Sequence, residues 1–369
     1  MEAKRKLRVL FIASVARAKD GMTGGLSTIA IRLFYSRMQD QFEHIALEPS
    51  IPPIFDSLPM RFFRSAQRFL RFLKQLPKTD IVLALTADGL SIVEKGAMCV
   101  LARLCNKGVA ILPVSGYLEA QIKDWWWMRQ WLRLVFRCTH FVFAQGENWR
   151  LLFIGVGAQP ERTIILKNAV IMHEVRALEY GGSRRPCIFY AGWMIRLKGI
   201  FEMVDVMSQV LAEFPSAQLV IAGDGPDRKE FESSCEKAGI MSSVVMRGWL
   251  SDEEIRLQYM ASDIFLLPSH AEGMPNTVLE AMSHGVPVVS TCVGSVPELI
   301  VHGESGFLAD VGDAAAMAES IRTILRDPQL ARRIGKAGWE AVRREHDVER
   351  IWPVCARALH EAAHATGRE

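Results

Sequence analysis

The sequence predicts an α/β protein with two domains, each built on a doubly wound parallel β-sheet. The chain has 369 residues, which is more than a single compact core holds in most folds. Short apolar runs that read as strands alternate with longer helical patterns through both halves of the chain. This alternation is typical of parallel sheets with helices on both faces. We place the first domain at residues 1–172, a linker at 173–186 and the second domain at 187–347.

The composition is that of an ordinary soluble globular protein, with 50% hydrophobic and 23% charged residues. No run of about eighteen uncharged apolar residues is present, so no transmembrane helix is predicted. The basic start of the chain precedes only a short apolar run, Val9 to Val15, which we interpret as a strand rather than a secretion signal. The seven cysteines include no C-x-x-C pair and no histidine at ligand spacing. These features favour reduced thiols, a cytoplasmic location and no metal site.

Charge is divided unevenly along the chain. Residues 1–172 contain 24 Lys and Arg and 13 Asp and Glu, whereas the remaining residues contain 20 and 28, for a formal net charge of +3. The asymmetry predicts that the first half faces an anionic partner or surface. Nucleic acid is disfavoured, because this half has no recognised nucleic-acid motif and its basic residues are interleaved with tryptophans.

The first domain opens with a strand at Val9–Ala13. A loop leads to the pair Gly24 and Gly25, from which a helix is predicted to about Ser36. Two glycines at a strand-to-helix turn let a ligand approach the backbone closely. Further strands are predicted at residues 44–47, 81–85, 110–113, 141–144 and 163–166. The strand at 110–113 leads into the loop that contains Ser115.

Residues 61–74 predict a basic amphipathic helix. Basic side chains recur every three or four positions and share one helical face, and apolar side chains cover the remainder. The basic positions are Arg61, Arg64, Arg68, Arg71 and Lys74, and the apolar ones are Phe62, Phe69, Leu70, Phe72 and Leu73. Such a helix either lies on an anionic membrane surface or presents a solvated basic face, and the sequence leaves both open.

Residues 123–137 combine tryptophans with basic side chains. The residues concerned are Trp125, Trp126, Trp127, Trp131, Lys123, Arg129, Arg133 and Arg137. Tryptophan favours interfaces, because its large apolar ring also carries a polar N–H. Three consecutive tryptophans are not expected all to lie in a core, so at least one is predicted to face a groove, a partner or lipid.

The second domain is predicted to contain strands at residues 188–191, 219–222, 244–247, 264–268 and 286–290. After the strand at 264–268 comes a loop with Glu272 and then a helix that contains Glu280. Pro275 is expected at the first helical position and Gly285 at C′, which suit their backbone preferences. The N-terminus of this helix, with unpaired N–H groups and a partial positive charge, suits phosphate oxygens. The two glutamates on either side of it are placed to bind hydroxyls at both ends of a sugar nucleotide.

The string that begins at Glu272, EGMPNTVLEAMSHGVPVVSTCVGSVPELI, resembles the donor-binding segment of retaining glycosyltransferases of the GT-B fold, the group 1 (GT4) family. An isolated E-x7-E spacing is far more often part of an ordinary strand–helix unit, so the length of the string carries the resemblance. Shorter matches lie at residues 192–199, 223–226 and 303–307. The resemblance implies two Rossmann-like domains that face each other across a cleft, with the final helix, 348–369, packed back on the first domain.

The resemblance also implies roles for individual residues. Glu280 would bind the ribose hydroxyls of the donor, and Glu272 would hold its sugar together with backbone N–H groups of residues 273–276. Lys198 would neutralise the leaving diphosphate and is, with Glu272, a predicted catalytic residue. The other implied donor-binding residues are Gly24, Gly25, Gly192, Arg196, Trp249, Gly273, Met274, Pro275, Asn276 and Thr277.

Two departures from the family pattern affect the roles expected at the donor site. Trp193 stands where an arginine that holds the diphosphate is usual, and we expect Arg196 to supply that charge. Ser115 stands where family members often have a histidine that points at the donor sugar, so the role of that histidine is assigned to no residue. A charge-assisted hydrogen bond contributes about 1.5–3 kcal/mol, so one lost phosphate contact would weaken donor binding without abolishing it.

The resulting hypothesis is a retaining glycosyltransferase that needs no metal or other cofactor. It would move a sugar from a UDP- or GDP-linked donor to a hydroxyl of a glycan or lipid-linked acceptor, in bacterial polysaccharide or lipopolysaccharide synthesis. The basic and tryptophan-rich segments favour peripheral contact with the inner face of the cell membrane. Two alternatives remain: a sugar-nucleotide epimerase or phosphorylase on the same fold, and a non-catalytic sugar-nucleotide-binding protein.

Overall fold

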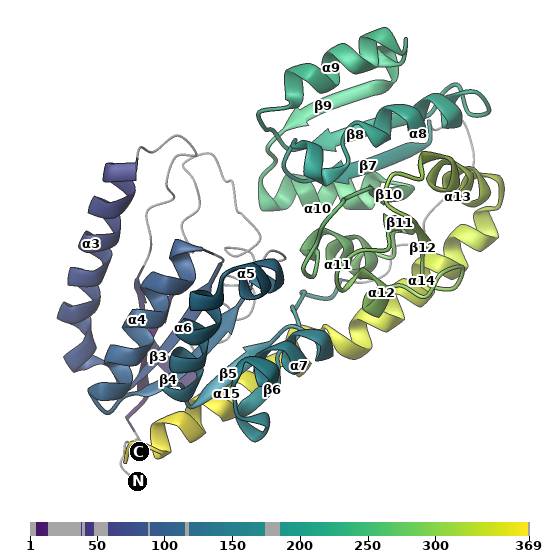
Figure 1. Ribbon diagram of the computed structural model, residues 1–369. Coiled ribbons are helices and arrows are strands. Elements are labelled where there is room, and N and C mark those ends of the chain that lie inside the picture. Colours follow the sequence, from purple (N-terminus) through teal and green to yellow (C-terminus); the bar gives the residue numbers. More distant parts are fainter. Residues whose placement is uncertain are drawn as a thin grey trace. The chain divides into compact units, whose positions relative to one another are not determined.

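The computed structural model describes residues 5–13, 38, 41–47, 58–87, 89–114, 118–173 and 185–367 (Figure 1). These residues contain two parallel six-stranded sheets, which confirms the predicted α/β class. One unit consists of the described residues up to Ala169 together with those from Val348 onward, and the other runs from Val170 to Asp347. The first unit thus ends at Ala169 rather than at residue 172, and the chain returns to it at Val348.

The sheet of the first unit has the strand order β2-β1-β3-β4-β5-β6. Its strands are β1 (Leu7–Ile12), β2 (Phe42–Leu47), β3 (Ile81–Thr86), β4 (Gly108–Pro113), β5 (Phe141–Ala144) and β6 (Thr163–Ile165). Every residue of β3 and β4 is buried. Strands that are covered on both faces read as continuous apolar runs, and this is why the sequence revealed them.

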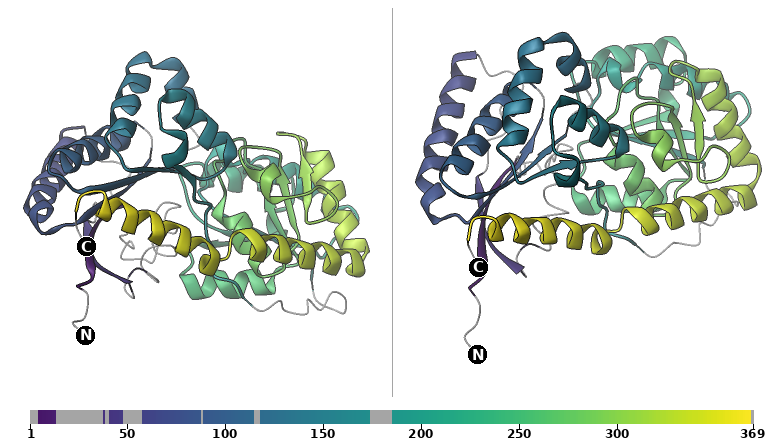
Figure 2. Two further views of the ribbon diagram at one scale, coloured as in Figure 1. Left: turned by 90° about the horizontal axis from the view of Figure 1, so that it is seen from below. Right: turned by 60° about the horizontal axis from the view of Figure 1, so that its bottom comes forward.

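Alternate side chains of a strand point to opposite faces, so this sheet contributes to two separate cores. Leu10 and Val82 lie in the core beneath the helices between β2 and β6. These helices are α3 (Leu58–Gln75), α4 (Leu90–Leu104), α5 (Leu118–Asp124), α6 (Trp126–Arg137) and α7 (Glu147–Val156). Val9 and Leu83 lie in the other core, which α15 (Val348–His364) covers. Figure 2 shows α15, in yellow, along the face of the sheet opposite these helices.

The α3 helix differs from the sequence prediction in where its side chains lie. Phe72 is fully buried, but Leu70 and Leu73, which were expected to share its apolar side, are exposed. Arg68, expected on the basic face, instead donates two hydrogen bonds to Glu94 of α4, at 2.8 and 2.7 Å. The outer face of α3 is therefore a mixture of basic and apolar side chains rather than a purely basic one.

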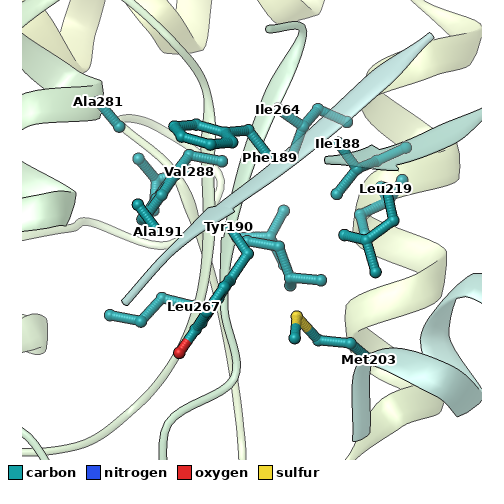
Figure 3. Packing of buried hydrophobic residues seen from close by; sticks show 14 of the residues in the cluster. Ile188, Phe189, Tyr190, Ala191, Met203, Leu219, Ile264, Leu267, Ala281 and Val288 are labelled. Carbon is teal, nitrogen blue, oxygen red and sulfur yellow. The ribbon is translucent and has the colours of Figure 1, made fainter. Parts of the chain in front are cut away.

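The sheet of the second unit has the order β12-β11-β10-β7-β8-β9. Its strands are β7 (Cys187–Ala191), β8 (Gln218–Ala222), β9 (Val244–Gly248), β10 (Ile264–Leu267), β11 (Val288–Thr291) and β12 (Phe307–Ala309). Side chains from β7, β8, β10 and β11 meet in its core, as Figure 3 shows. The short strand β12 was not predicted; it pairs with β11 directly after a turn.

The helices of the second unit surround this sheet. They are α8 (Glu202–Leu211), α9 (Arg228–Lys237), α10 (Asp252–Ala261), α11 (Asn276–Ser283), α12 (Val296–Leu299), α13 (Ala314–Arg326) and α14 (Pro328–Glu345). One-turn 3₁₀ helices lie at η2 (Leu76–Lys78), η3 (Pro160–Arg162), η4 (Arg196–Lys198) and η5 (Met241–Ser243). No disulfide joins the seven cysteines. In the parts of the chain that the structure describes, no helix has the length and apolar character needed to cross a membrane.

Candidate functional site

The strand order of the second unit reverses between β7 and β10. From β7 the chain proceeds to β8 and β9, and it then returns to β10 on the other side of β7. The loops that follow these two strands therefore diverge at the carboxyl edge of the sheet, which is where open α/β sheets bind ligands. The loop after β7 carries Lys198 and the loop after β10 carries Glu272. The topology thus brings together two residues that are 74 positions apart.

Lys198 and Glu272 form an ion pair at this edge. Lys198 Nζ donates to Glu272 Oε1 at 2.6 Å, and the two side chains are only 24% and 9% exposed. The two expected catalytic residues therefore lie in contact. Charges so little exposed are costly to leave without partners. A ligand that separates this pair must bring an anion for the ammonium and hydrogen-bond donors for the carboxylate.

Close backbone approaches fix the two loops. Gly199 has a φ of +69°, and a Cβ there would lie 1.9 Å from the Pro268 carbonyl oxygen, so only glycine fits. Gly294 has a φ of +54°, and a Cβ there would lie 2.0 Å from the Glu272 carbonyl oxygen. The position of the Lys198–Glu272 pair is thus set by packed backbone as well as by the side chains themselves.

A second polar pair, His270 and Glu202, joins the same loops and was missed in the sequence analysis. Glu202 lies in the first turn of α8, and its Oε1 is 2.6 Å from His270 Nε2. The backbone N–H of His270 donates to the Leu197 carbonyl oxygen at 2.9 Å. Neither side chain belongs to a recognisable motif, and 68 positions separate them. No signal in a single sequence indicates this contact, which depends on the register of two distant loops.

Glu280 lies within α11 and is buried. Its Oε2 accepts a hydrogen bond from the Tyr259 hydroxyl of α10 at 2.8 Å. Tyr259 was also missed from the sequence; its phenol orients the carboxylate that is expected to bind ribose. His284 stacks on the Tyr259 ring with centroids 5.4 Å apart. Burial lowers the pKa of His284, so its imidazole is neutral at pH 7 and adds no charge here.

The ends of α11 fall close to the predicted positions. Pro275 is the N-cap residue rather than the first helical residue, because its ψ of 114° keeps it extended. Gly285 has a φ of +73°, which confirms the expected left-handed residue after the helix. The first turn of α11 leaves backbone N–H groups without acceptors inside the helix, as every helix does.

Trp249 meets Trp193 at the carboxyl edge of the sheet. Their rings pack edge to face with centroids 5.1 Å apart. The Trp193 carbonyl oxygen accepts a hydrogen bond from the Tyr190 hydroxyl at 2.8 Å. Burial, and then the charge of Glu272, raises the pKa of Tyr190, so its phenol stays protonated and remains a donor. Trp193 therefore contributes an aromatic ring to this edge, where the family pattern has a charged arginine.

The structure does not bring Arg196 to the Lys198–Glu272 pair. Its guanidinium forms an exposed ion pair with Glu230 of α9 at 2.8 Å and lies over the Phe201 ring at 4.2 Å. An exposed ion pair contributes about 0–1 kcal/mol, so little free energy holds Arg196 there.

The other expected residues are distributed as follows. Met274 is buried, and Gly273, Asn276 and Thr277 are partly exposed along the start of α11. Gly192 packs against Gly223, where a Cβ would lie 1.8 Å from the Gly192 carbonyl oxygen. The remaining three, Gly24, Gly25 and Ser115, lie outside the described residues. Among the residues that are described, no three His, Cys, Asp or Glu side chains gather as a metal site would require.

Together these groups offer a ligand a cation, two carboxylates, a helix N-terminus and an aromatic pair. Lys198 and the N-terminus of α11 suit the oxygens of a phosphate. Glu272 and Glu280 suit hydroxyl groups, because ionised carboxylates only accept hydrogen bonds. The arrangement suits a ligand with an anionic centre and hydroxyl groups at both ends.

Comparison with known sequences finds a family match within the second unit. The family described as Glycosyl transferases group 1 matches residues 181–340. The chain is 31% identical to the sulfoquinovosyl transferase SQD2 of Arabidopsis thaliana over 44% of this chain and 31% of that protein. It is 31% identical to the N-acetyl-alpha-D-glucosaminyl L-malate synthase of Bacillus anthracis over 47% of this chain and 45% of that protein. The chain thus spans less than half the length of these curated relatives.

Solved structures resemble nearly the whole chain. Sucrose-phosphate synthase from Thermosynechococcus elongatus has a TM-score of 0.78 at 19% identity, over 98% of this chain and 100% of that chain. Anabaena Alr3699/HepE in complex with UDP has a TM-score of 0.70 at 18% identity, over 96% of this chain and 100% of that chain. At such identities the likeness shows the fold alone, which is the α/β organisation of GT-B glycosyltransferases. Residues 181–340 thus match the family of group 1 glycosyltransferases, and the chain as a whole is similar in fold to GT-B glycosyltransferases.

Proposed function

We propose that this chain is a retaining glycosyltransferase that uses a nucleotide-diphosphate-sugar donor and needs no metal ion. The observation that carries the proposal is the Lys198–Glu272 pair, which joins the segment after β7 to the loop that leads from β10 into α11 at the edge of the sheet. A sugar nucleotide supplies both partners that would replace the pair: a diphosphate for the ammonium and sugar hydroxyls for the carboxylate.

Each group of the site has one task in this proposal. Lys198 and the first-turn N–H groups of α11 bind the diphosphate. Glu272 binds the sugar, and Glu280, oriented by Tyr259, binds the ribose. Trp249, with Trp193 packed against it, lies next to the base.

The reaction exchanges one bond to the anomeric carbon for another. The bond from C1 to the diphosphate oxygen breaks, the bond from C1 to the acceptor oxygen forms on the same face, and the acceptor proton passes to a phosphate oxygen. Negative charge grows on the departing diphosphate, where Lys198 and the N-terminus of α11 stabilise it. Glu272 binds a hydroxyl in this scheme and is not a covalent nucleophile.

The names of relatives support the choice of substrates. Anabaena Alr3699/HepE has been solved with UDP-glucose. LpsE of Rhizobium meliloti is named for lipopolysaccharide core biosynthesis, and CapM of Staphylococcus aureus for capsular polysaccharide biosynthesis. We therefore propose a UDP- or GDP-linked donor and a glycan or lipid-linked acceptor of a bacterial cell surface.

Proton NMR of donor hydrolysis tests the proposal. The purified chain is incubated with UDP- and GDP-sugars, without added metal and with a chelator, and the anomeric signal of the first released sugar is followed before mutarotation. Retention predicts the anomeric configuration of the donor, and the opposite configuration would refute it. A donor that binds but is never cleaved, with or without glycan acceptors, would favour the non-catalytic alternative, which the uncharged Trp193 suggests.

A further inference from the structure

The outer face of α6 carries large apolar side chains that the core of the first unit does not use. Its inner face contributes Met128, Leu132, Val135 and Phe136 to that core. On the opposite side, Trp126 is 78% exposed, Leu134 46% and Trp127 42%. Trp125, just before the helix, is 41% exposed, and its ring stacks on Trp127 with centroids 5.6 Å apart. All three consecutive tryptophans are thus directed out of the core.

The outer face of α3 has the same character. Phe63 and Leu70 are seven positions apart, which places them on one stripe of the helix, and both are more than half exposed. Their stripe lies opposite Phe72, which is buried against the sheet.

The helices α3, α4 and α6 form one layer on the same face of the sheet (Figure 1). Arg68 of α3 is paired with Glu94 of α4 at 2.7 Å. Trp131 Nε1 of α6 donates to the Ile92 carbonyl oxygen of α4 at 3.3 Å. Because the inner sides of α3 and α6 both pack on this sheet, their outer sides both point away from it.

The charge of these two helices is entirely positive. Neither contains an Asp or Glu, whereas α3 holds five basic residues and α6 holds three. Arg129 and Arg133 donate to the carbonyl oxygens of Gly155 and Val156, at 3.2 Å each, at the end of α7. These bonds hold two guanidinium groups in place, and within the described residues no carboxylate forms an ion pair with either of them.

We propose that the outer sides of α3 and α6 form a docking surface for an anionic lipid bilayer. Indole rings prefer the boundary between headgroups and acyl chains, and arginine and lysine are attracted by anionic headgroups. A soluble acidic partner would match the arginines alone. Exposed indoles among them fit a partner that is apolar beneath an anionic layer, which is how a bilayer is built. The proposal rests on the first unit only and stands or falls independently of the proposed glycosyl transfer.

Vesicle co-sedimentation of the full chain, without donor or acceptor, tests this surface. Vesicles of phosphatidylcholine alone are compared with vesicles of equal parts phosphatidylcholine and phosphatidylglycerol. We expect binding to the anionic vesicles that falls as sodium chloride is raised, because salt screens the charges. Each basic residue near an anionic surface contributes about fivefold to partitioning, so Arg71→Gln and Arg137→Gln should each weaken binding by about that factor.

Matched variants show whether the loss of binding is specific to this surface or follows from removing any exposed apolar or basic side chain. Trp126→Ser removes the most exposed indole, and we expect several-fold weaker binding with an unchanged melting temperature. Leu257→Ser, at an exposed apolar position on α10, and Arg333→Gln, at an exposed basic position on α14, should leave vesicle binding unchanged.

Four results would overturn the proposal. The first two are the absence of binding to anionic vesicles and equal binding to neutral vesicles. The third is that the control variants weaken binding as much as Trp126→Ser does. The fourth is that Trp126→Ser binds as the wild type does and that heparin competes with the vesicles. The last result would assign the surface to a soluble polyanion instead.

Discussion

Lys198 is the residue on which donor binding should depend most, because its ammonium lies in the site whereas the Arg196 guanidinium is paired elsewhere. Lys198→Met keeps most of the side-chain length and removes the charge. We expect donor affinity to fall by about 10- to 100-fold, the size of a lost charge-assisted hydrogen bond. Isothermal titration with the nucleotide donor measures the change.

Two further variants show whether the loss of donor affinity is specific to Lys198. Lys336→Met, on the exposed side of α14, should bind donor as the wild type does. Arg196→Met should cost less than Lys198→Met. An Arg196→Met variant that loses as much affinity as Lys198→Met would mean that Arg196 leaves Glu230 to bind the diphosphate, as the sequence analysis expected.

His140 should make the stability of the first unit depend on pH. Its Nδ1 accepts a hydrogen bond from the Val109 N–H at 3.0 Å. Burial, more than the nearby arginines, lowers the pKa of His140 to about 4. Between pH 6.5 and about 4 the unfolded chain therefore binds a proton that the folded chain does not. The free energy of unfolding should fall as pH falls through this window, by at most about 1.4 kcal/mol per pH unit.

The variant His140→Asn isolates this contribution. The Asn side-chain oxygen can accept the Val109 N–H as Nδ1 does, but it does not titrate. Urea unfolding at pH 7 and pH 5 should show a smaller pH effect in the variant than in the wild type. An equal pH effect in the two proteins would show that His140 is not the group responsible.

At the scale of elements, the loop after η4 depends on a glycine that no other residue can replace. Gly199→Ala would place a Cβ 1.9 Å from the Pro268 carbonyl oxygen at a φ of +69°. Gly239 has a similar φ of +71° with open space around it, so Gly239→Ala carries the backbone strain alone. We expect Gly239→Ala to lower the free energy of unfolding by about 1–2 kcal/mol.

Gly199→Ala should lower the free energy of unfolding by more and should also weaken donor binding, because Gly199 directly follows Lys198 at the end of η4. Urea unfolding and donor titration of the two variants give the comparison. Equal losses of stability in both would show that the contact with Pro268 is relieved easily and does not position the loop.

The elements themselves were largely predictable, and the contacts between them were not. Buried parallel strands such as β3, β5 and β10 read as continuous apolar runs, and Gly285 marked the end of α11. In contrast, the His270–Glu202 and Tyr259–Glu280 contacts join residues whose spacing depends on loop lengths and strand order. The short strand β12 has three residues and no periodicity of its own, so only its pairing with β11 reveals it.

At the scale of the whole molecule, α15 should determine the stability of the first unit although it lies at the other end of the sequence. Trp352, Cys355 and Leu359 lie in the core that also contains Val9 and Phe11. No local pattern in the sequence indicates this packing, which was expected only from the family resemblance.

Leu359→Ala should therefore lower the free energy of unfolding of the first unit by about 2–5 kcal/mol, because it leaves a cavity in a packed core. Val354→Ala, on the exposed side of the same helix, should cost far less. Hydrogen exchange resolves the two units: protection should fall in β1, β3 and β4 and stay unchanged in β7 and β10. Equal loss in both units would contradict the assignment of α15 to the first.

The central claim, a sugar-nucleotide site on the second unit, is tested most directly by a thermal-shift panel of UDP, GDP, ADP and their common sugar conjugates. The panel is applied to the wild type, to Glu280→Ala and to Glu340→Ala, a control on α14. A ligand at a hundred times its Kd stabilises the folded chain by about 2.7 kcal/mol, which raises the melting temperature measurably. We predict that one nucleotide stabilises the wild type and Glu340→Ala and that Glu280→Ala loses most of this effect. No stabilisation by any nucleotide, or an equal shift in all three proteins, would contradict the claim.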